Sequence, residues 1–335
     1  MIREAVMRLV EGRDLGYLEA QAVMDEMMTG KASDIQTSAF LAALAAKGET
    51  VDEITAFAVS MRSHGVKLPG MTEAVEIVGT GGDRSGSFNI STASSFVVSA
   101  AGAPVAKHGN RAANSRCGAA DVLEALGADI TIGPGKSARI LEEIGICFMF
   151  AQDYHAAMRH VAPVRRKLGI RTVFNILGPL TNPAAARMQL MGVYDGSLLE
   201  PLARVMSNLG VEKGMTVHGA DGLDEISVCA PTSVCEIRNG TIMDYTIEPE
   251  KLGIRLCSEG DIAGGGPEEN ARIIREVLGG ERGPRRDIVL LNSAAALYIA
   301  DRCGSVSGGL TLAAAAIDSG RASERLERFV DMTRF

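Results

Sequence analysis

Three polar clusters follow one another between residues 79 and 111, and they limit how this segment can fold. They are Gly79-Thr80-Gly81-Gly82-Asp83, Asn89-Ile90-Ser91-Thr92 and Lys107-His108-Gly109-Asn110-Arg111. The apolar run 75–78 predicts a strand that leads into the first cluster, 91–101 predicts a helix that starts in the second, and Val105-Ala106 predicts a strand before the third. This order of strand, loop, helix and strand is typical of a layered α/β fold.

The same clusters are suited to a phosphorylated ligand. Glycine lets the backbone approach a ligand closely, and the free N–H groups of a loop and a helix start attract anions. Lys107 and Arg111 would supply countercharge. A single glycine-rich loop is most often a simple turn, and neither the Walker pattern nor the Rossmann spacing is present. The series of three clusters is what favours a phosphate site.

The composition restricts the partners. The chain has 335 residues, which suggests two domains at roughly 150 residues each, and 38 glycines, which fits a fold with many turns. Its formal net charge of −7 offers no general attraction for nucleic acid or an anionic membrane surface. We therefore expect neither as a partner.

The cysteines and the apolar runs indicate a cytoplasmic protein. The six cysteines show no Cys-x-x-Cys spacing, which is typical of reduced thiols rather than of disulfides or a zinc site. The first residues predict an amphipathic helix without a signal-like core. No apolar run approaches the ~18 residues of a membrane span.

The first 65 or so residues predict helices only. Ala20, Val23, Met24 and Met27 share one helical face. Ser33–Gln36 and Thr50–Glu53 match the capping box, in which a Ser or Thr precedes a Gln or Glu by three residues. Met24, Met27 and Met28 are expected in the core, and a dimer contact is the alternative.

From Val75 onward, short β-branched runs alternate with helical patterns, which predicts an α/β domain with a mostly parallel sheet. Asn239-Gly240 between two apolar runs predicts a hairpin, so the sheet should be mixed. The predicted strands are 75–78, 104–107, 147–151, 189–194, 214–218 and 225–229. The predicted helices are 91–101, 120–126, 136–144, 154–168 and 197–209, with more helices after Glu268.

Two further regions carry chemistry. Asp224-Glu225 is either solvated charge at a turn or, if it faces the phosphate loops, a pair of Mg²⁺ ligands. Asp83 beside the first loop could serve similarly or accept from ribose hydroxyls. Pro163 should kink or bound the helix predicted over 154–168. Arg165 and Arg166 follow, and an arginine there could face a substrate carboxylate; for Arg166 we favour simple surface charge.

These motifs, together with the stretch 161–183, resemble the anthranilate phosphoribosyltransferases of tryptophan biosynthesis over essentially the whole chain. The resemblance implies a small helical domain at 1–70, joined by helices from about 160–185, and a large α/β domain at 71–335. It also implies a homodimer through the helical part. The implied reaction transfers phosphoribose from phosphoribosyl diphosphate to the amine of anthranilate with Mg²⁺, and two ions per site are expected.

The resemblance also assigns site residues. Ser91, Asp224 and Glu225 would bind the metal, and Gly79, Asn110 and Arg165 would hold anthranilate, with Arg165 at its carboxylate. Phosphoribosyl diphosphate would be bound by Gly79, Gly82, Asp83, Ser87, Asn89, Ile90, Ser91, Thr92, Lys107, His108, Gly109, Asn110, Arg111, Ala112, Ala113, Asn114, Ser115 and Ala119. No dedicated acid or base stands out, and Lys107 and His108 are weak candidates.

The chain departs from the family pattern at a few positions. Ala119 stands where the family commonly has a serine that touches the donor, and its loss is worth ~0.5–1.5 kcal/mol of donor binding. Cys117, Ser87 and Asn114 are milder departures. A pyrimidine nucleoside phosphorylase-like enzyme and a non-catalytic nucleic-acid-binding relative are the alternative functions.

Overall fold

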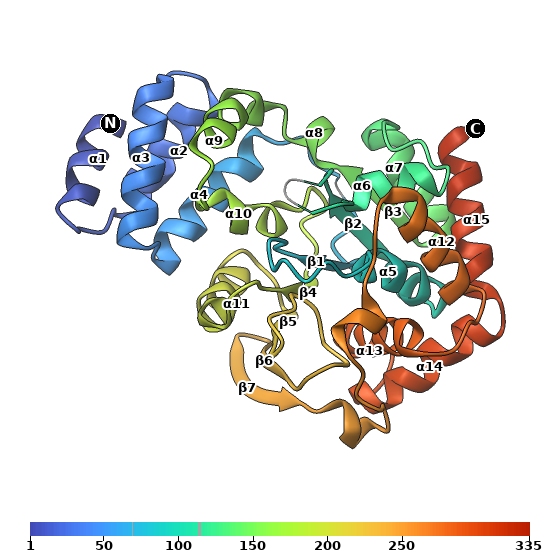
Figure 1. Ribbon diagram of the computed structural model, residues 1–335. Coiled ribbons are helices and arrows are strands. Elements are labelled where there is room, and N and C mark those ends of the chain that lie inside the picture. Colours follow the sequence, from blue (N-terminus) through green and yellow to red (C-terminus); the bar gives the residue numbers. More distant parts are fainter. Residues whose placement is uncertain (69, 113–114) are drawn as a thin grey trace.

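The computed structural model describes residues 1–68, 70–112 and 115–335. Its N-terminal part consists of α1 (Ile2–Val10), α2 (Tyr17–Met28), α3 (Asp34–Lys47) and α4 (Val51–His64). Short helices from the middle of the chain pack beside it, namely η1 (Ala156–His160), α9 (Ala162–Leu168), α10 (Phe174–Leu177) and η2 (Pro179–Thr181). Figure 1 shows this helical part at the end of the molecule away from the C-terminal helix α15 (Arg321–Arg334).

Within the described residues, seven strands form one sheet in the order β3-β2-β1-β4-β5-β6-β7. The strands from β3 to β5 are parallel, and β6 and β7 add an antiparallel hairpin. Their bounds are β1 (Val75–Gly79), β2 (Val105–Gly109), β3 (Ile146–Phe150), β4 (Met188–Gly192), β5 (Lys213–Gly219), β6 (Thr232–Arg238) and β7 (Thr241–Ile247). The carboxyl ends of β1, β2 and β4 therefore meet at one edge of the sheet, where ligands bind in open α/β folds.

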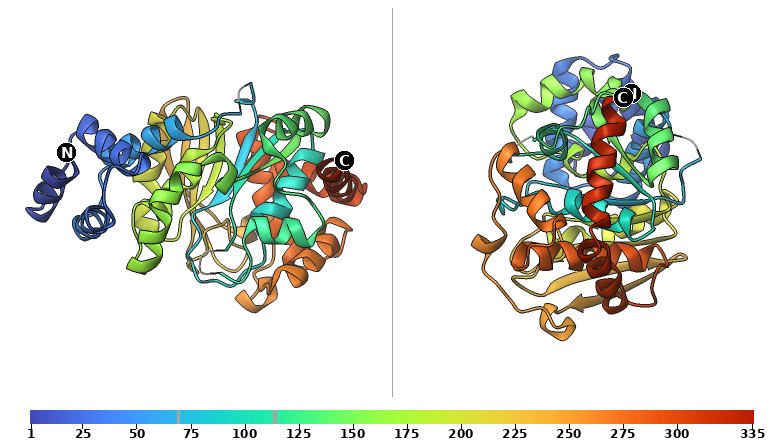
Figure 2. Two further views of the ribbon diagram at one scale, coloured as in Figure 1. Left: turned by 90° about the horizontal axis from the view of Figure 1, so that it is seen from above. Right: turned by 90° about the vertical axis from the view of Figure 1, so that its right-hand side faces the viewer.

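Helices cover both faces of the sheet (Figure 2). On one face, Ile77 and Val217 belong to a core cluster shared with the C-terminal helices. The helices of that face are α5 (Ile90–Ala100), α6 (Ala119–Ala125), α7 (Gly133–Ile144), α12 (Pro267–Leu278), α13 (Pro284–Ile299), α14 (Val306–Asp318) and α15. The remaining short helices are α8 (Ala151–Tyr154), η3 (Gly196–Leu198), η4 (Pro249–Leu252) and η5 (Glu259–Ile262).

On the other face, α11 (Leu199–Asn208) and the N-terminal helices share one continuous apolar cluster with Met191 of β4 and Cys235 of β6. A small helical part beside a large α/β part is thus confirmed, with a mixed and mostly parallel sheet. Because this core runs without interruption from the helices to the sheet, the domain boundary at residue 70 stays a prediction.

The predictions made from local sequence motifs were largely correct. Both capping boxes are formed at the starts of α3 and α4. Asn239 and Gly240 both have positive φ, at 50° and 81°, as a tight hairpin turn requires. Met24, Met27 and Met28 are buried inside the chain. These methionines are therefore core, and the alternative that they form a dimer surface is wrong.

The strand predicted over 225–229 is wrong, although the segment is buried. Asn292 of α13 takes the place of a neighbouring strand: its Nδ2 donates to the Ile226 carbonyl (2.9 Å) and its Oδ1 accepts from the Ile226 N–H (2.9 Å). The Ser227 N–H donates to Thr232 Oγ1. Side chains thus satisfy this backbone, and an apolar pattern alone does not reveal them.

The helix predicted over 154–168 is broken into α8, η1 and α9. Pro163 is the second residue of α9, where its missing N–H leaves no helical bond unmade. The proline therefore marks a helix boundary, which is one of the two outcomes expected for it. Among the described residues, no helix is long and apolar enough to cross a membrane.

Glu53 connects the helices of the N-terminal part. Its buried Oε1 accepts from the Leu15 N–H (2.9 Å), and its Oε2 accepts from the Thr50 N–H (2.8 Å) and from Lys47 Nζ (2.9 Å). One carboxylate therefore satisfies two backbone groups and one buried ammonium. Removing it leaves buried polar groups without partners, which is costly.

We expect Glu53→Ala to lower the free energy of unfolding by about 2–4 kcal/mol. Asp52→Ala is the matched control, because Asp52 is an exposed carboxylate in the same helical turn and should change stability by less than about 1 kcal/mol. Urea unfolding followed by circular dichroism measures both. Equal losses in the two variants would contradict the role given to Glu53.

Candidate active site

Asp224 occupies the sheet edge where β1 and β4 end. The structure leaves room for it only because Gly79 and Gly192 lack side chains: a Cβ on Gly79 would overlap Asp224 Oδ2, and one on Gly192 would overlap the Asp224 carbonyl. These two glycines are partners in the register of β1 and β4. The predicted loop glycine Gly79 is thus fixed by its contact with an acidic residue far along the chain.

The loop Gly79–Asp83 is held by four contacts. The Gly81 N–H donates to Asp224 Oδ2 (2.6 Å), and the Thr80 N–H donates to the Gly192 carbonyl (2.9 Å). Thr80 Oγ1 accepts from the Tyr194 N–H (3.1 Å), and the Gly82 carbonyl accepts from Arg171 Nη2 (2.8 Å). Gly81 and Gly82 have φ of 67° and 79°, a backbone shape that favours glycine.

Acidic groups gather behind this loop. Burial, Asp83 and Glu225 together hold the pKa of Asp224 well above its usual range, and the Asp224 N–H lies 3.5 Å from Asp83 Oδ2. Burial raises the pKa of Glu225 to about 7, although Lys107 opposes the shift and Ser91 opposes it to a smaller extent. Negative charge crowded in a buried place is stabilised by a cation.

The donor set fits a hard divalent cation. Asp83, Asp224, Glu225 and Ser91 offer oxygen ligands only, which Mg²⁺ prefers together with water and phosphate oxygens. Within the described ranges, three or more His, Cys, Asp or Glu side chains do not converge into a complete metal cluster. Such a site would take its remaining ligands from a bound phosphate and from water.

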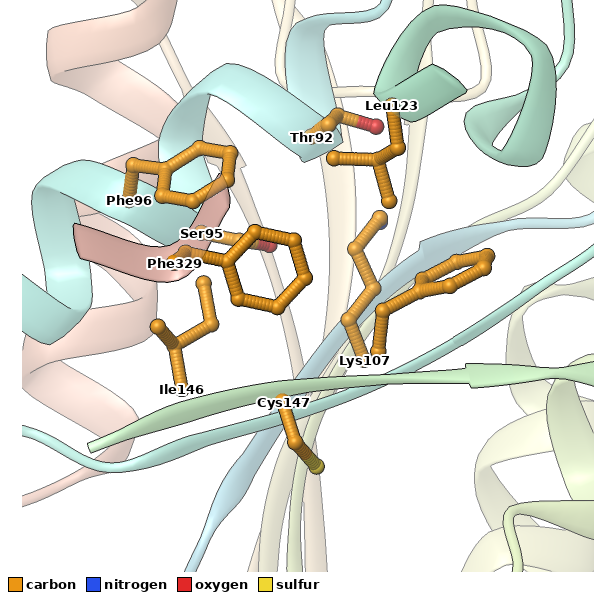
Figure 3. A pocket seen from close by; sticks show the side chains of 9 residues that line it. Thr92, Ser95, Phe96, Lys107, Leu123, Ile146, Cys147 and Phe329 are labelled. Atoms are coloured by element: carbon orange, nitrogen blue, oxygen red, sulfur yellow. The ribbon is translucent and has the colours of Figure 1, made fainter. Parts of the chain in front are cut away.

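Lys107 points into the protein rather than into open solvent. Its Nζ donates to the Ile77 carbonyl (2.8 Å) and to Ser91 Oγ (3.2 Å). Figure 3 shows it rising from β2 beside a small cavity lined by apolar side chains, among them Leu123 and Phe329. Burial lowers its pKa to about 8, against the opposing effect of Glu225 and Glu76. Lys107 thus connects the strand to Ser91 at the start of α5.

The other members of the second cluster lie at and before the N-terminus of α5. Asn89 is its N-cap, donating to the Cys117 carbonyl (3.2 Å) and accepting from Asn270 (2.9 Å). Ile90 and Thr92 are buried, and Thr92 Oγ1 has no hydrogen-bond partner among the described residues. Ser87 is half-buried and pairs with Ala263 through a single β-bridge. The structure therefore brings Ser91 and Asn89 to the site edge, whereas Ile90 belongs to the core.

His108 is buried after the middle of β2. Its ring packs edge-on against His155 at 5.1 Å between centroids, and burial lowers its pKa to about 3, with a smaller effect from His155. It is therefore neutral at physiological pH. A neutral and weakly basic imidazole agrees with the low rank given to His108 as a candidate base.

Between β2 and α6, Asp121 organises the loop. Its Oδ2 accepts from the N–H groups of Ala112 (2.9 Å) and Gly118 (2.8 Å), while Arg111 pairs with Asp121 and Glu124. Gly109 ends β2, Asn110 Oδ1 accepts from the Arg111 N–H, and Ser115 is exposed. Ala113 and Asn114 lie outside the described residues. The Arg111 guanidinium is thus occupied by acids in this structure.

Arg165 lies on α9, half-buried, with its guanidinium over the Phe174 ring at 5.1 Å. Burial lowers its pKa. No hydrogen bond or ion pair joins it to Gly79 or Asn110 in the part of the chain that the structure describes. The predicted acceptor residues therefore come from separate elements, α9, the β2 end and the β1 end, and a bound acceptor would have to bridge them.

Several residues at the site were missed. Arg171 and Tyr194 hold the glycine loop, and the Arg171 guanidinium lies 4.1 Å from the centre of the Tyr194 ring. Asp121 and Asn270 hold the loops around α6 and Asn89. Gly192 lies inside the strand predicted over 189–194, and a glycine within a strand is a usable signal of a close approach. The long-range contacts of Arg171 and Asn270 have no local pattern.

The chain matches known proteins over nearly its full length. A model of a glycosyl transferase family's a/b domain matches residues 71–323, and that of the helical bundle domain matches residues 3–65. An anthranilate phosphoribosyltransferase of Methanobrevibacter smithii is 58% identical over 333 residues, which cover 99% of each chain. The chain belongs to the anthranilate phosphoribosyltransferase family.

Solved members of this family share the fold. The enzyme from Thermus thermophilus aligns with a TM-score of 0.94 at 43% identity and 99% coverage of each chain. The enzyme from Saccharomyces cerevisiae, solved in complex with PRPP and Mg, aligns with a TM-score of 0.92 at 27% identity, covering 99% of this chain and 98% of that one. The yeast enzyme was also solved with 4-fluoroanthranilate.

Ala119, the main departure from the family pattern, is the first residue of α6. Its Cβ lies where a side chain on Gly109 would meet it. Gly118 and Asp121 still cap this helix, so the alanine leaves the local backbone arrangement intact. Its effect on donor binding stays a prediction.

Glu76 is a further buried acid, on β1 next to the site. Gln189 Nε2 donates to its Oε2 (3.2 Å), whereas its Oε1 has no partner among the described residues. Burial raises its pKa to about 8, and Asn182, Lys107 and Arg62 offset part of that effect. Glu76 therefore holds its proton at neutral pH, while the same side chain in the unfolded chain does not.

A carboxyl whose pKa is raised on folding stabilises the protein below its unfolded pKa and loses that contribution as pH rises through the folded value. For Glu76 the window runs from the ordinary value of 4.5 to about 8. We expect Glu76→Gln to be more stable relative to wild type at pH 8 than at pH 5, by on the order of 4 kcal/mol. Urea unfolding at both pH values measures this. If the stability difference between Glu76→Gln and wild type were the same at both pH values, the assignment would be refuted.

Proposed function

We propose that this protein transfers 5-phosphoribose from phosphoribosyl diphosphate to the amine of anthranilate, giving N-(5-phosphoribosyl)anthranilate and diphosphate. This is the second step of tryptophan synthesis from chorismate. The observation that carries the proposal is the hydrogen bond from the Gly81 N–H to Asp224 Oδ2 (2.6 Å). This bond joins the glycine loop to the acidic pair Asp224-Glu225, which supports one shared site for the phosphate groups and the metal. Relatives named anthranilate phosphoribosyltransferase match 99% of the chain.

The donor would lie between the glycine loop, the N-terminus of α5 and the end of β2, which is followed by Asn110, Arg111 and Ala112. The free N–H groups of α5 favour a phosphate there. Among the predicted donor residues, Gly82, Asp83, Asn89 and Ser91 are the best supported, since their groups reach the site edge. Lys107 would act mainly by fixing Ser91.

Mg²⁺ would be held by Ser91, Asp224 and Glu225, with Asp83 nearby, and two ions would suit the number of acidic oxygens. When bound, Mg²⁺ neutralises the charge that develops on the departing diphosphate. Ionised Asp224 and Glu225 are disfavoured by burial, so these residues are arranged for a cation rather than for the empty site. The complex of the yeast relative with PRPP and Mg supports this part of the proposal.

The chain's own residues would orient the two reactants rather than transfer a proton. The anthranilate amine is nucleophilic while neutral, so no strong base is needed. His108, with a pKa of about 3, is too weak a base to take a proton in the ground state. Holding the amine in line with the anomeric carbon then supplies much of the rate enhancement. Arg165 would position anthranilate by its carboxylate, with Asn110 and Gly79 at the ring and amine.

The test is product formation from anthranilate, phosphoribosyl diphosphate and MgCl₂, followed by the loss of anthranilate fluorescence and by mass spectrometry. Turnover that needs all three components is expected. Absence of product at saturating levels of both substrates would overturn the proposal. Phosphorolysis of a pyrimidine nucleoside would instead support the alternative enzyme class.

We expect Arg165→Ala to raise the KM for anthranilate by about 10- to 100-fold, since a charge-assisted hydrogen bond to the carboxylate is lost. The KM for phosphoribosyl diphosphate should stay within about twofold. Arg166→Ala, which removes an exposed arginine from the same helix, should leave both values near wild type. A similar loss for both substrates would contradict the role of Arg165.

We further propose that the protein is a homodimer formed through its helical part and that it acts in the cytoplasm. Large apolar side chains are exposed on α1, α2 and α3: Val10 (74%), Leu18 (77%) and Ile35 (81%). Exposed apolar groups gathered in one part of a molecule often mark an interface. Its cysteines are free thiols in the structure, as in a reducing compartment.

A charge on this surface should separate the protomers. We expect Leu18→Glu to shift the mass measured by light scattering from that of a dimer to that of a monomer of 35.2 kDa. Met243→Glu, at an exposed apolar position on β7, should leave the dimer intact. A monomeric wild type, or dissociation of both variants alike, would contradict the proposed interface.

A further inference from the structure

Arg171 is not among the predicted site residues, yet it makes two contacts at the donor loop. Its Nη2 donates to the Gly82 carbonyl (2.8 Å), and its guanidinium lies over the Tyr194 ring, 4.1 Å from the centroid. Tyr194 in turn donates its backbone N–H to Thr80 Oγ1 (3.1 Å). Both ends of the loop are therefore tied to one Arg171–Tyr194 pair.

The contact at Gly82 fixes the orientation of a peptide unit. The peptide bonds of the described residues are trans, so the Gly82 carbonyl and the Asp83 N–H point in opposite directions. With the carbonyl held at Arg171, the Asp83 N–H is turned away from Arg171. A glycine at positive φ can change its peptide orientation at little steric cost, and the reversed peptide would present an oxygen where an N–H now lies.

We propose that Arg171 is a positioning residue for the transfer reaction. It latches the Gly82–Asp83 peptide in the orientation that presents N–H groups, not a carbonyl oxygen, to the phosphate groups of the donor. This rests on the proposed function. Tyr194 is the platform that holds the guanidinium in place, since a planar guanidinium stacks well on an aromatic ring.

The position of Arg171 in the chain gives the latch a second consequence. Arg171 follows α9, which carries Arg165, and precedes Thr172, whose N–H donates to Asn175 Oδ1 (2.9 Å) at the start of α10. The same short segment therefore carries the proposed anthranilate arginine and the contact to the donor loop. The latch therefore ties the donor loop to the segment that carries the proposed anthranilate arginine.

Loss of the latch lowers the fraction of molecules with a competent loop, and the apparent donor affinity falls by that fraction. We expect Arg171→Ala to raise the KM for phosphoribosyl diphosphate about five- to tenfold, with kcat and the KM for anthranilate within about twofold. Tyr194→Leu should raise the same KM by a smaller factor. Arg166→Ala is the control and should change none of these values.

Direct contact of Arg171 with the donor phosphate is the competing explanation, and two measurements separate it from the latch. A direct ionic contact makes the donor KM of wild type rise more steeply with salt than that of Arg171→Ala, whereas the latch predicts parallel salt dependences. Arg171→Lys keeps the charge but not the planar fork. If Arg171 acts as a latch, Arg171→Lys should restore less than half of the lost affinity for the donor. If Arg171 contacts the donor directly, the lysine should restore most of it.

Hydrogen exchange on the free protein tests the latch without turnover. Amides from Gly81 to Ser85 should exchange about five- to tenfold faster in Arg171→Ala than in wild type or Arg166→Ala. This result would stand even if anthranilate proved not to be the acceptor, so failure of the latch and failure of the proposed function are distinguishable. Unchanged exchange in this segment, or a donor KM within twofold of wild type, would overturn the proposal.

Discussion

The close packing of Asp224 against Gly79 and Gly192 is the contact on which the rest of the site depends. A side chain at either glycine would overlap Asp224, so the two strand ends and the acid can be adjacent only with this combination of residues. The contact fixes where the loop after β1 starts, and the Gly81 N–H then bonds to the same carboxylate. Thr80, Tyr194 and Arg171 complete a loop whose shape follows from that one acid.

The same contact concentrates negative charge in a place with little water. Asp224 and Glu225 are buried side by side and Asp83 adjoins them, whereas Glu76, one strand position from the Lys107 contact at Ile77, keeps its proton at neutral pH. Lys107 is a single ammonium among these groups, and it cannot neutralise all of them. An arrangement of this kind lowers stability in the absence of ligand. On the proposed function, a bound cation and a phosphorylated donor offset this cost, which is where stability and activity oppose each other.

Much of the fold could be predicted from local patterns, because strand runs, capping boxes and the Asn239-Gly240 turn depend on neighbours in the sequence. The errors occurred where a distant side chain decided the outcome. Asn292 satisfies the backbone at Ile226 in place of a strand, and nothing near residue 226 indicates this. In the site, the chemistry of a phosphate loop suggested acids nearby, and the bond from Gly81 to Asp224 joins the two. The inward direction of the Lys107 side chain and the contacts of Arg171 depend on residues far away in the sequence. Local sequence patterns therefore could not predict them.

The distribution of apolar and polar contacts indicates where this site can adjust. Val161, Phe174 and Leu177 on the acceptor side belong to the same buried cluster as Met191 of β4 and Leu202 of α11, so moving the acceptor segment as a whole would expose apolar surface. Its contact with the donor loop is instead a polar contact between exposed residues, from Arg171 to Gly82. Such a contact contributes only about 1 kcal/mol and can open and close without disturbing the core. A change at this polar contact and in the glycine loop therefore leaves the buried elements that carry Arg165 and Asp224 in place.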